Sequence, residues 1–319
     1  MPLDPQIANI LKFLANSGAP SIASGTVEQA RAGFRAGTVG VRNVATLAQV
    51  RSVADITVPG AAGDLAARVY RPDIDGPVPT MVFFHGGGFV IGDIETHDDQ
   101  ARLICRDGEM VVVSVDYRLA PEHPFPAGYE DCLSATRWAA DNISDLGGDA
   151  SRLLVGGDSA GGNLAANVAL AFRGEDPTIA AQFLIYPGLD LREDSDYPSR
   201  VENAEGYFLT AEDMLWFRDQ YLPAGHDLSR PGHSPMMSTD LTGLPPAVIG
   251  VGEFDPLRDE DLAYGKALAD AGVEVVVRLY DGLIHGFFGF TQLSAAAADA
   301  TADMIAALKT MLAVESATS

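Results

Sequence analysis

Apolar, strand-like runs that alternate with helical stretches constrain the fold of this 319-residue chain most strongly. The apolar runs cover residues 80–84, 110–115, 152–156, 182–186, 247–251 and 273–279. Helical patterns lie between most of them, near residues 98–107, 127–142, 160–173, 259–271 and 293–313. Buried apolar strands that alternate with helices indicate an α/β fold, in which a mostly parallel sheet is covered by helices on both faces.

The region before residue 79 adds two helices and a hairpin. Residues 5–16 carry apolar side chains at helical spacing, and a second helix is expected after Thr26, a suitable N-cap. Residues 50–59 and 65–71 are predicted to be strands joined by a Gly-Ala-Ala-Gly turn. With this hairpin, the predicted sheet has eight strands.

Residues 190–230 interrupt the alternation. The segment is densely charged and then rich in aromatic residues, and Thr210 followed by Asp213 is typical of a capping box at a helix start. A helical insertion between two strands suggests a cap over a site, with the N-terminal helices beside it. The alternative is that side chains such as Trp216 and Met214 pack in an ordinary core.

Residues 157–161 read Gly-Asp-Ser-Ala-Gly and stand between a strand-like run and a helical run. In that context the motif is typical of a tight turn that presents a nucleophilic serine. Glycine is needed at the flanking positions because a side chain would clash in so tight a turn. The start of the following helix also favours developing negative charge. Ser159 is the predicted nucleophile; the alternative is a glycine-rich turn without chemistry.

Three consecutive glycines, residues 86–88, follow the first apolar run. Acyl transfer passes through an oxyanion that preorganised donors must meet, and glycines leave their backbone amides unobstructed. The predicted oxyanion hole is formed by the N–H groups of Gly87, Gly88 and Ala160, a pattern known from lipase and esterase loops. We interpret His85 as a brace for this loop rather than as a catalytic base.

A serine nucleophile needs a base and an acid that orients the base, and hydrolases with this serine turn place them in the order serine, acid, histidine. His226 and His233 read as surface loop residues, so His285, after the last strand-like run, is the predicted base. Asp255 follows the preceding run and is the predicted acid. Glu253 stays open as an alternative acid.

Five motifs, in this order, resemble those of the bacterial hormone-sensitive-lipase-like carboxylesterases of the GDSAG subgroup in the α/β-hydrolase superfamily. They are HGGGF at 85–89, DYRLAPEHPFPA at 116–127, GDSAGGN at 157–163, DPLRDE at 255–260 and HGF at 285–287. The resemblance extends over residues 80–290. It implies the α/β-hydrolase fold, the triad and oxyanion hole named above, and hydrolysis of short-acyl esters without a cofactor.

The resemblance also implies a helical cap, residues 1–45 and 190–230, over a catalytic domain, residues 46–189 and 231–319. We expect a serine carboxylesterase that hydrolyses short-acyl, small neutral esters through an acyl-enzyme intermediate. The apolar residues predicted to line its substrate pocket are Phe89, Phe208, Ile284 and Phe287.

Charge and composition limit the partners. The chain has 44 acidic and 21 basic residues, a formal net charge of -23, which disfavours nucleic acid and anionic membranes and favours neutral substrates. The alternative is that acidity serves solubility alone. Neither a leader pattern nor a long apolar stretch is visible, so we expect a cytoplasmic protein with two reduced, buried cysteines, Cys105 and Cys132.

Other clusters of polar residues are interpreted as structural. Asp93, Glu95, His97 and Asp98 lack the regular spacing of a metal site, so we predict no metal and assign the acids to a helix start. Asp259 and Glu260 are assigned to another helix start. The proline-rich segment 116–126 is expected to be a rigid, salt-bridged loop beneath the site.

Two further functions and one assembly stay open. A binding protein on the same fold would not need His285, and an amidase would use the same residues as an esterase. Residues 273–279 are predicted to form an edge strand, and since such edges pair with other strands, a homodimer is expected.

Overall fold

The computed structural model describes residues 2–16, 18, 21–227 and 232–318. Its centre is an eight-stranded sheet with the order β1-β2-β4-β3-β5-β6-β7-β8. The strands are β1 (Ser52–Pro59), β2 (Asp64–Arg71), β3 (Val78–Phe84), β4 (Val111–Val115), β5 (Gly148–Asp158), β6 (Ala181–Ile185), β7 (Ala247–Phe254) and β8 (Val275–Ile284). The predicted eight-stranded, mostly parallel sheet is confirmed.

Strand direction brings the ends of the central strands to one edge. The β1–β2 hairpin is antiparallel, and β2 runs antiparallel to β4, whereas all other pairs are parallel. In the parallel register, Phe84 lies opposite both Val115 and Gly157. The segments that follow these strands therefore emerge side by side, as ligand sites in open α/β sheets require.

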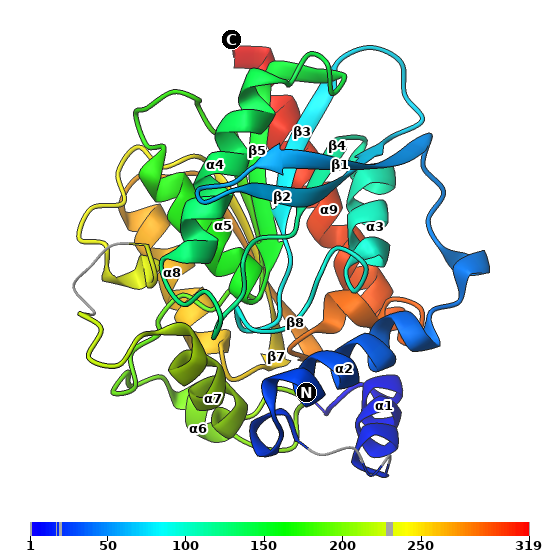
Figure 1. Cartoon of the computed structure of the whole chain (residues 1–319), viewed down its shortest axis with the longest axis vertical. Helices are drawn as coiled ribbons and strands as arrows, with labels where there is room; N and C mark the ends of the chain where they lie inside the picture. Colours follow the sequence, from blue (N-terminus) through cyan, green and yellow to red (C-terminus); the bar gives the residue numbers. More distant parts are fainter. Residues whose placement is uncertain (1, 17, 19–20, 228–231, 319) are drawn as a thin grey trace.

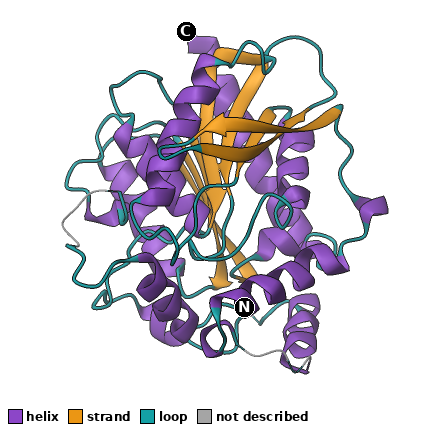
Figure 2. Ribbon diagram, in the orientation of Figure 1, coloured by secondary structure: helices purple, strands orange, loops and turns teal. Residues whose placement is uncertain are grey.

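Helices cover both faces of the sheet, as Figures 1 and 2 show. Met81 and Phe83 of β3 pack toward α3 and α9, while Val82 and Phe84 pack toward α4, α5 and α8. This alternation follows from the two-residue period of a strand. The longer helices of the two layers are α3 (Asp98–Gly108), α4 (Ala127–Asp141), α5 (Ala160–Ala171), α8 (Arg258–Asp270) and α9 (Ala295–Thr318).

The remaining helices gather near the carboxyl ends of β7 and β8 (Figure 1). They are α1 (Pro5–Asn16), α2 (Val27–Thr38), α6 (Pro198–Glu202) and α7 (Ala211–Tyr221). Short 3₁₀ turns elsewhere in the chain are η1 (Ile22–Ser24), η2 (Val39–Val41), η3 (Val44–Thr46), η4 (Pro235–Met237) and η5 (Phe287–Phe290). The N-terminal and inserted segments touch, because the Ala23 N–H donates to Asp213 Oδ1 at 3.2 Å.

Capping residues fix where two of these helices begin. Thr26 accepts from the Gln29 N–H, and the Gln29 side chain accepts from the Thr26 N–H. Thr210 and Asp213 form the same reciprocal pair at α7. Each capping box satisfies backbone donors that the first helical turn leaves free. Both predicted helix starts are confirmed.

Cys105 and Cys132 are free and buried, as predicted. Among the described residues, no helix combines the length and the apolar character needed to cross a membrane.

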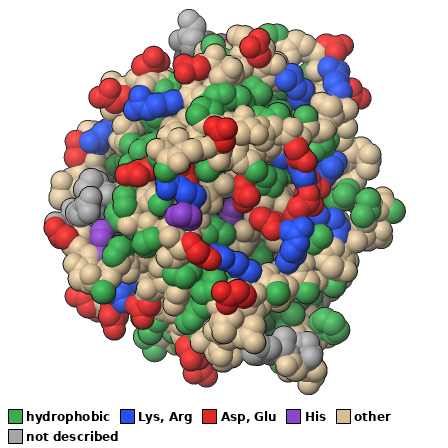
Figure 3. All heavy atoms as spheres, viewed as in Figure 1, with side chains coloured by type: hydrophobic (Ala, Val, Ile, Leu, Met, Phe, Trp, Pro, Cys, Tyr) green, Lys and Arg blue, Asp and Glu red, His purple; other side chains and the backbone are tan. Residues whose placement is uncertain are grey.

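On the face that Figure 3 draws, acidic side chains are spread over the surface with basic side chains among them.

Candidate active site

Ser159 occupies a strained turn between β5 and α5. Its backbone has φ 54° and ψ -117°, a conformation that costs a non-glycine residue energy and is typical of functional sites. Gly161 permits the turn, because a Cβ there would lie 1.9 Å from the Phe84 carbonyl oxygen. The Ser159 N–H donates to the Ile185 carbonyl at 2.8 Å, which fixes the turn to β6.

Two hydrogen bonds of His285 connect Ser159 with Asp255. The distance from His285 Nε2 to Ser159 Oγ is 2.9 Å, and that from His285 Nδ1 to Asp255 Oδ2 is 2.8 Å. Asp255 is fully buried, and its Oδ1 accepts from the Leu257 N–H at 2.8 Å. The three residues predicted from the sequence are therefore brought together in the geometry of a nucleophile, a base and an orienting acid.

Glu253 points to a different partner. Its Oε2 accepts from the Gly282 N–H at 2.8 Å. Since both His285 nitrogens are occupied by Ser159 and Asp255, the geometry favours Asp255 as the acid.

The glycine loop after β3 presents free backbone donors beside Ser159. Gly87 has φ 117° and Gly88 has φ 59°, and a Cβ on Gly88 would lie 2.2 Å from the Phe217 ring. Glycine is therefore required there. In the described part of the chain, the N–H groups of Gly87, Gly88 and Ala160 donate to no protein acceptor. They are free to bind a developing oxyanion.

Behind this loop, Asp158 is a bracing residue that the sequence interpretation missed. Its Oδ1 accepts from the Gly86 N–H at 2.8 Å, and its Oδ2 lies 3.4 Å from His97 Nε2. Burial alone would raise the pKa of this carboxyl, but His97 and the Gly86 N–H hold the pKa below its ordinary value. The sequence signal that could have identified Asp158 is its position directly before Ser159 in the Gly-Asp-Ser-Ala-Gly motif.

His85 has the bracing role expected of it. Its Nδ1 lies 2.8 Å from the Gly86 carbonyl oxygen, and its ring stacks on Tyr117 with 4.5 Å between centroids. Complete burial, with His97 nearby, lowers the pKa of His85 to about 4. The imidazole is therefore neutral at pH 7.

Ser159, His285 and the glycine loop line a cavity of about 550 Å³. Phe89 and Phe208 line it as predicted. Ile284 and Phe287 are not among its lining residues and pack in the core on the α3 and α9 side, so that part of the pocket prediction is wrong. β8 continues through Ile284, which pairs with Phe254, and the turn after His285 directs Phe288 rather than Phe287 to the cavity.

Comparisons with known proteins identify the family. The model of the α/β-hydrolase fold matches residues 81–289. The chain belongs to the α/β-hydrolase family. Among the relatives of this hydrolase, the carboxylic ester hydrolase LipN of Mycobacterium tuberculosis is 45% identical over 267 residues, 82% of this chain and 70% of LipN. Ethyl acetate hydrolase of Pseudomonas putida is 37% identical over 228 residues, 70% and 71% of the two chains.

Solved structures agree with this assignment. A hyperthermophilic esterase from Pyrobaculum calidifontis shares 42% identity with a TM-score of 0.92. An ester hydrolase from the metagenome of Lake Arreo, bound to a bipyridine phosphonate derivative, shares 40% identity with a TM-score of 0.91. Each comparison covers 98% of the hydrolase and 99% of the other chain. The predicted fold, family and enzyme class, a hormone-sensitive-lipase-like carboxylic ester hydrolase, are confirmed.

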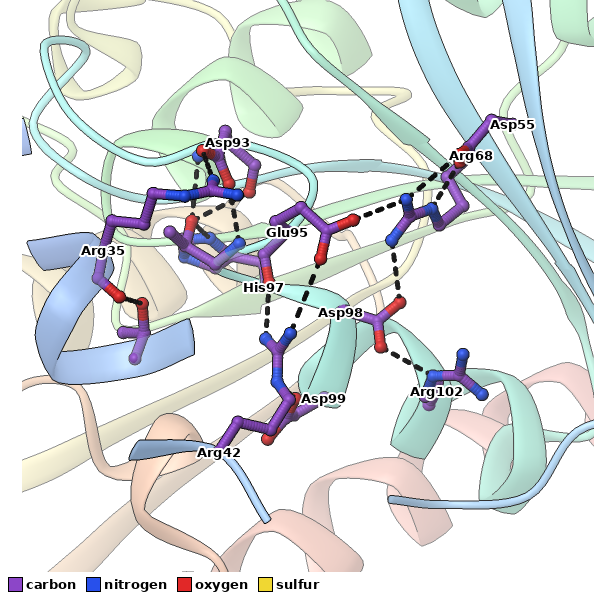
Figure 4. Close-up of polar contacts among 12 residues, drawn as sticks. Arg35, Arg42, Asp55, Arg68, Asp93, Glu95, His97, Asp98, Asp99 and Arg102 are labelled. Carbon is purple, nitrogen blue, oxygen red and sulfur yellow. Dashed lines mark hydrogen bonds and ion pairs between the residues drawn. The ribbon is translucent and has the colours of Figure 1, made fainter. Parts of the chain in front are cut away.

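Arginines of the N-terminal segment attach it to the body of the hydrolase (Figure 4), and one of these pairs, Arg42 with Asp99, also lines the cavity. Arg35 pairs with Asp93, and Arg42 pairs with Asp99 and, at 3.6 Å, with Glu95. The acids expected at the start of α3 thus also bind arginines. Among the residues that the structure describes, no group of three or more His, Cys, Asp or Glu side chains is arranged to hold a metal ion.

Glu260 lies at a helix start, as predicted, but it also has a second role. It is fully buried, its Oε1 accepts from the Leu189 N–H at 2.7 Å, and its Oε2 pairs with Arg200 at 2.5 Å. Burial raises the pKa of Glu260 to about 7, although Arg200 opposes the rise. This carboxyl ties the chain after β6 to α8 at the cavity wall.

Two loop predictions have different outcomes. His233 is fully buried, with its ring 5.6 Å from that of Phe125 and its carbonyl bound by Asn163 Nδ2 at 2.7 Å, so its assignment to the surface is wrong. The 116–126 loop is salt-bridged as predicted. Arg118 of this loop pairs with the buried Asp131 at 2.7 Å.

Proposed function

We propose that this hydrolase is a serine carboxylesterase in which Ser159 is the nucleophile, His285 the base and Asp255 the orienting acid. Ser159 Oγ attacks the ester carbonyl carbon while His285 Nε2 accepts the hydroxyl proton. Asp255 holds the imidazole tautomer and stabilises the imidazolium. The hydrogen-bonded series from Ser159 to Asp255, at the wall of a cavity, is the observation that carries the proposal.

The N–H groups of Gly87, Gly88 and Ala160 are proposed to stabilise the tetrahedral oxyanion. His285 then protonates the departing alcohol and leaves an acyl group on Ser159. A water molecule, deprotonated by His285, attacks that acyl group and releases the carboxylic acid. No cofactor enters these steps.

Short-acyl, small neutral esters are the proposed substrates. A cavity of about 550 Å³ with apolar walls such as Phe89, Phe208 and Phe217 supports this choice. We further propose that residues 1–45 and 190–230 act as a cap, because they supply cavity walls from α2 and α7. A cytoplasmic location, a homodimer and the absence of nucleic-acid or membrane partners stay predictions.

Hydrolysis rates for p-nitrophenyl esters of increasing acyl length test the proposed function. Because residues of the proposed cap, such as Phe217, bound the cavity, we expect kcat/KM to be highest for acyl chains of a few carbons and to fall for long chains. A maximum at long chains would contradict the substrate proposal, and no hydrolysis of any ester would contradict the activity itself.

A further inference from the structure

Gln100 is a polar side chain of the cavity wall that forms no hydrogen bond with any other residue that the structure describes. It lies in the first turn of α3, lines the cavity beside the active site and is only 7% exposed. Its Oε1 is buried without a hydrogen-bond partner. The described part of the chain contains no hydrogen bond from its Nε2 either.

The polar neighbours of Gln100 along the chain are already engaged. Thr96 Oγ1 donates to the Asp93 carbonyl at 2.8 Å and lies 2.9 Å from His97 Nδ1. Asp99 is paired with Arg42. A buried amide without a partner destabilises a protein, because its hydrogen bonds to water are lost and not replaced, so such a group calls for a specific explanation.

The Gln100 amide lies close to η5, the segment after His285, and this position indicates which part of a substrate could bind it. A Cβ added to Gly289 of η5 would lie 3.6 Å from Gln100 Nε2, and both residues line the cavity. η5 begins two residues after His285, with Gly286 between them as its N-cap. A substrate whose carbonyl is held at Ser159 and that extends along η5 would therefore bring its distal atoms toward the Gln100 amide.

We propose that Gln100 determines specificity by hydrogen bonding a hydroxyl group of the substrate. This inference rests on the proposed function and narrows it to small neutral esters that carry a hydroxyl on the acyl or the alcohol portion. A hydroxyl both donates and accepts, so it satisfies either end of the amide. Sites that hydrogen-bond a substrate hydroxyl discriminate strongly against analogues that lack it.

The test compares the wild-type enzyme with Gln100→Met, a substitution that keeps the length of the side chain and removes its amide. Two pairs of substrates replace a methyl by a hydroxyl: propyl and 2-hydroxyethyl butyrate for the alcohol portion, methyl butyrate and methyl 3-hydroxypropanoate for the acyl portion. Acid release is followed by pH-stat titration. In at least one pair, we expect Q100M to lower the ratio of kcat/KM for the hydroxyl ester to that for the methyl ester by about 3- to 10-fold.

Gln292→Met is the matched control, because Gln292 also lines the cavity but its Oε1 already accepts from Thr46 Oγ1. We expect its substrate ratios to stay at the wild-type values. Unchanged ratios for Q100M in both pairs, or an equal change in Q292M, would overturn the assignment while leaving the esterase proposal intact. Absence of hydrolysis by the wild type would instead overturn the proposed function.

A thermal melt gives a second readout that does not depend on activity. If Gln100 serves the substrate, Q100M removes an unpaired buried polar group, so Tm should stay the same or rise. A clear fall in Tm would show that the amide stabilises the fold, and would contradict its assignment to the substrate.

Discussion

At the scale of single residues, His285 connects the groups of the site because both of its ring nitrogens are engaged. Its neighbours at 2.8 Å and 2.9 Å are Asp255 and Ser159. Ser159 and His285 could be predicted from the sequence by the strand–turn–helix context and by chain order, whereas chain order left Glu253 open beside Asp255. Whether the side chains of Ile284 and Phe287 face the cavity could not be predicted, because the direction of a side chain at the end of a strand depends on where that strand, β8, ends.

The identity of the acid gives a prediction at this scale. Asp255→Asn should lower kcat/KM by about four orders of magnitude, because an amide no longer holds the imidazole in the productive tautomer. Glu253→Gln, the control, should change it by no more than about twofold, since Glu253 contacts a backbone N–H instead of His285. Steady-state kinetics with one p-nitrophenyl ester compares them, and the opposite ranking would identify Glu253 as the acid.

At the scale of elements, arginines attach α2 and η2 to the segments beneath them. Besides the pairs of Arg35 and Arg42, Arg31 binds both oxygens of Glu122, each at 2.7 Å. The helices themselves could be predicted, because their caps and periodicity are local signals. The ion pairs could not, because their partners lie 50 or more residues apart and only the folded arrangement brings them together.

The pair of Arg31 and Glu122 predicts a dependence of stability on pH. Arg31 lowers the pKa of Glu122 to about 2, from an ordinary value of 4.5. A lowered carboxyl pKa stabilises the fold above pH 4.5, and that contribution is lost as the pH falls toward 2. Both side chains are partly exposed, so the pair should contribute only about 0.2–1 kcal/mol.

Urea unfolding of the wild type and Glu122→Gln at several values between pH 7 and pH 3 measures this contribution. The variant should be less stable at pH 7, and the difference should shrink below pH 4.5. A difference that stays constant with pH would mean that packing, and not the charge of Glu122, is responsible.

At the scale of the whole molecule, one sheet edge collects the groups of the site. The glycine loop follows β3, Ser159 follows β5, Asp255 follows β7 and His285 follows β8. The alternation of apolar runs and helices predicted this arrangement, because parallel strands end at a common edge. The cavity wall at Gln100 could not be predicted, since it forms only where α3 meets η5.

Reaction with a serine-directed phosphonate, followed by intact-mass and peptide-mass measurement, tests whether Ser159 is the nucleophile. We expect one adduct per chain, located on Ser159, with parallel loss of ester hydrolysis and no adduct in Ser159→Ala. A binding protein without an activated serine would remain unmodified. An adduct on another residue, or full activity after modification of Ser159, would contradict the assignment of Ser159 as the nucleophile.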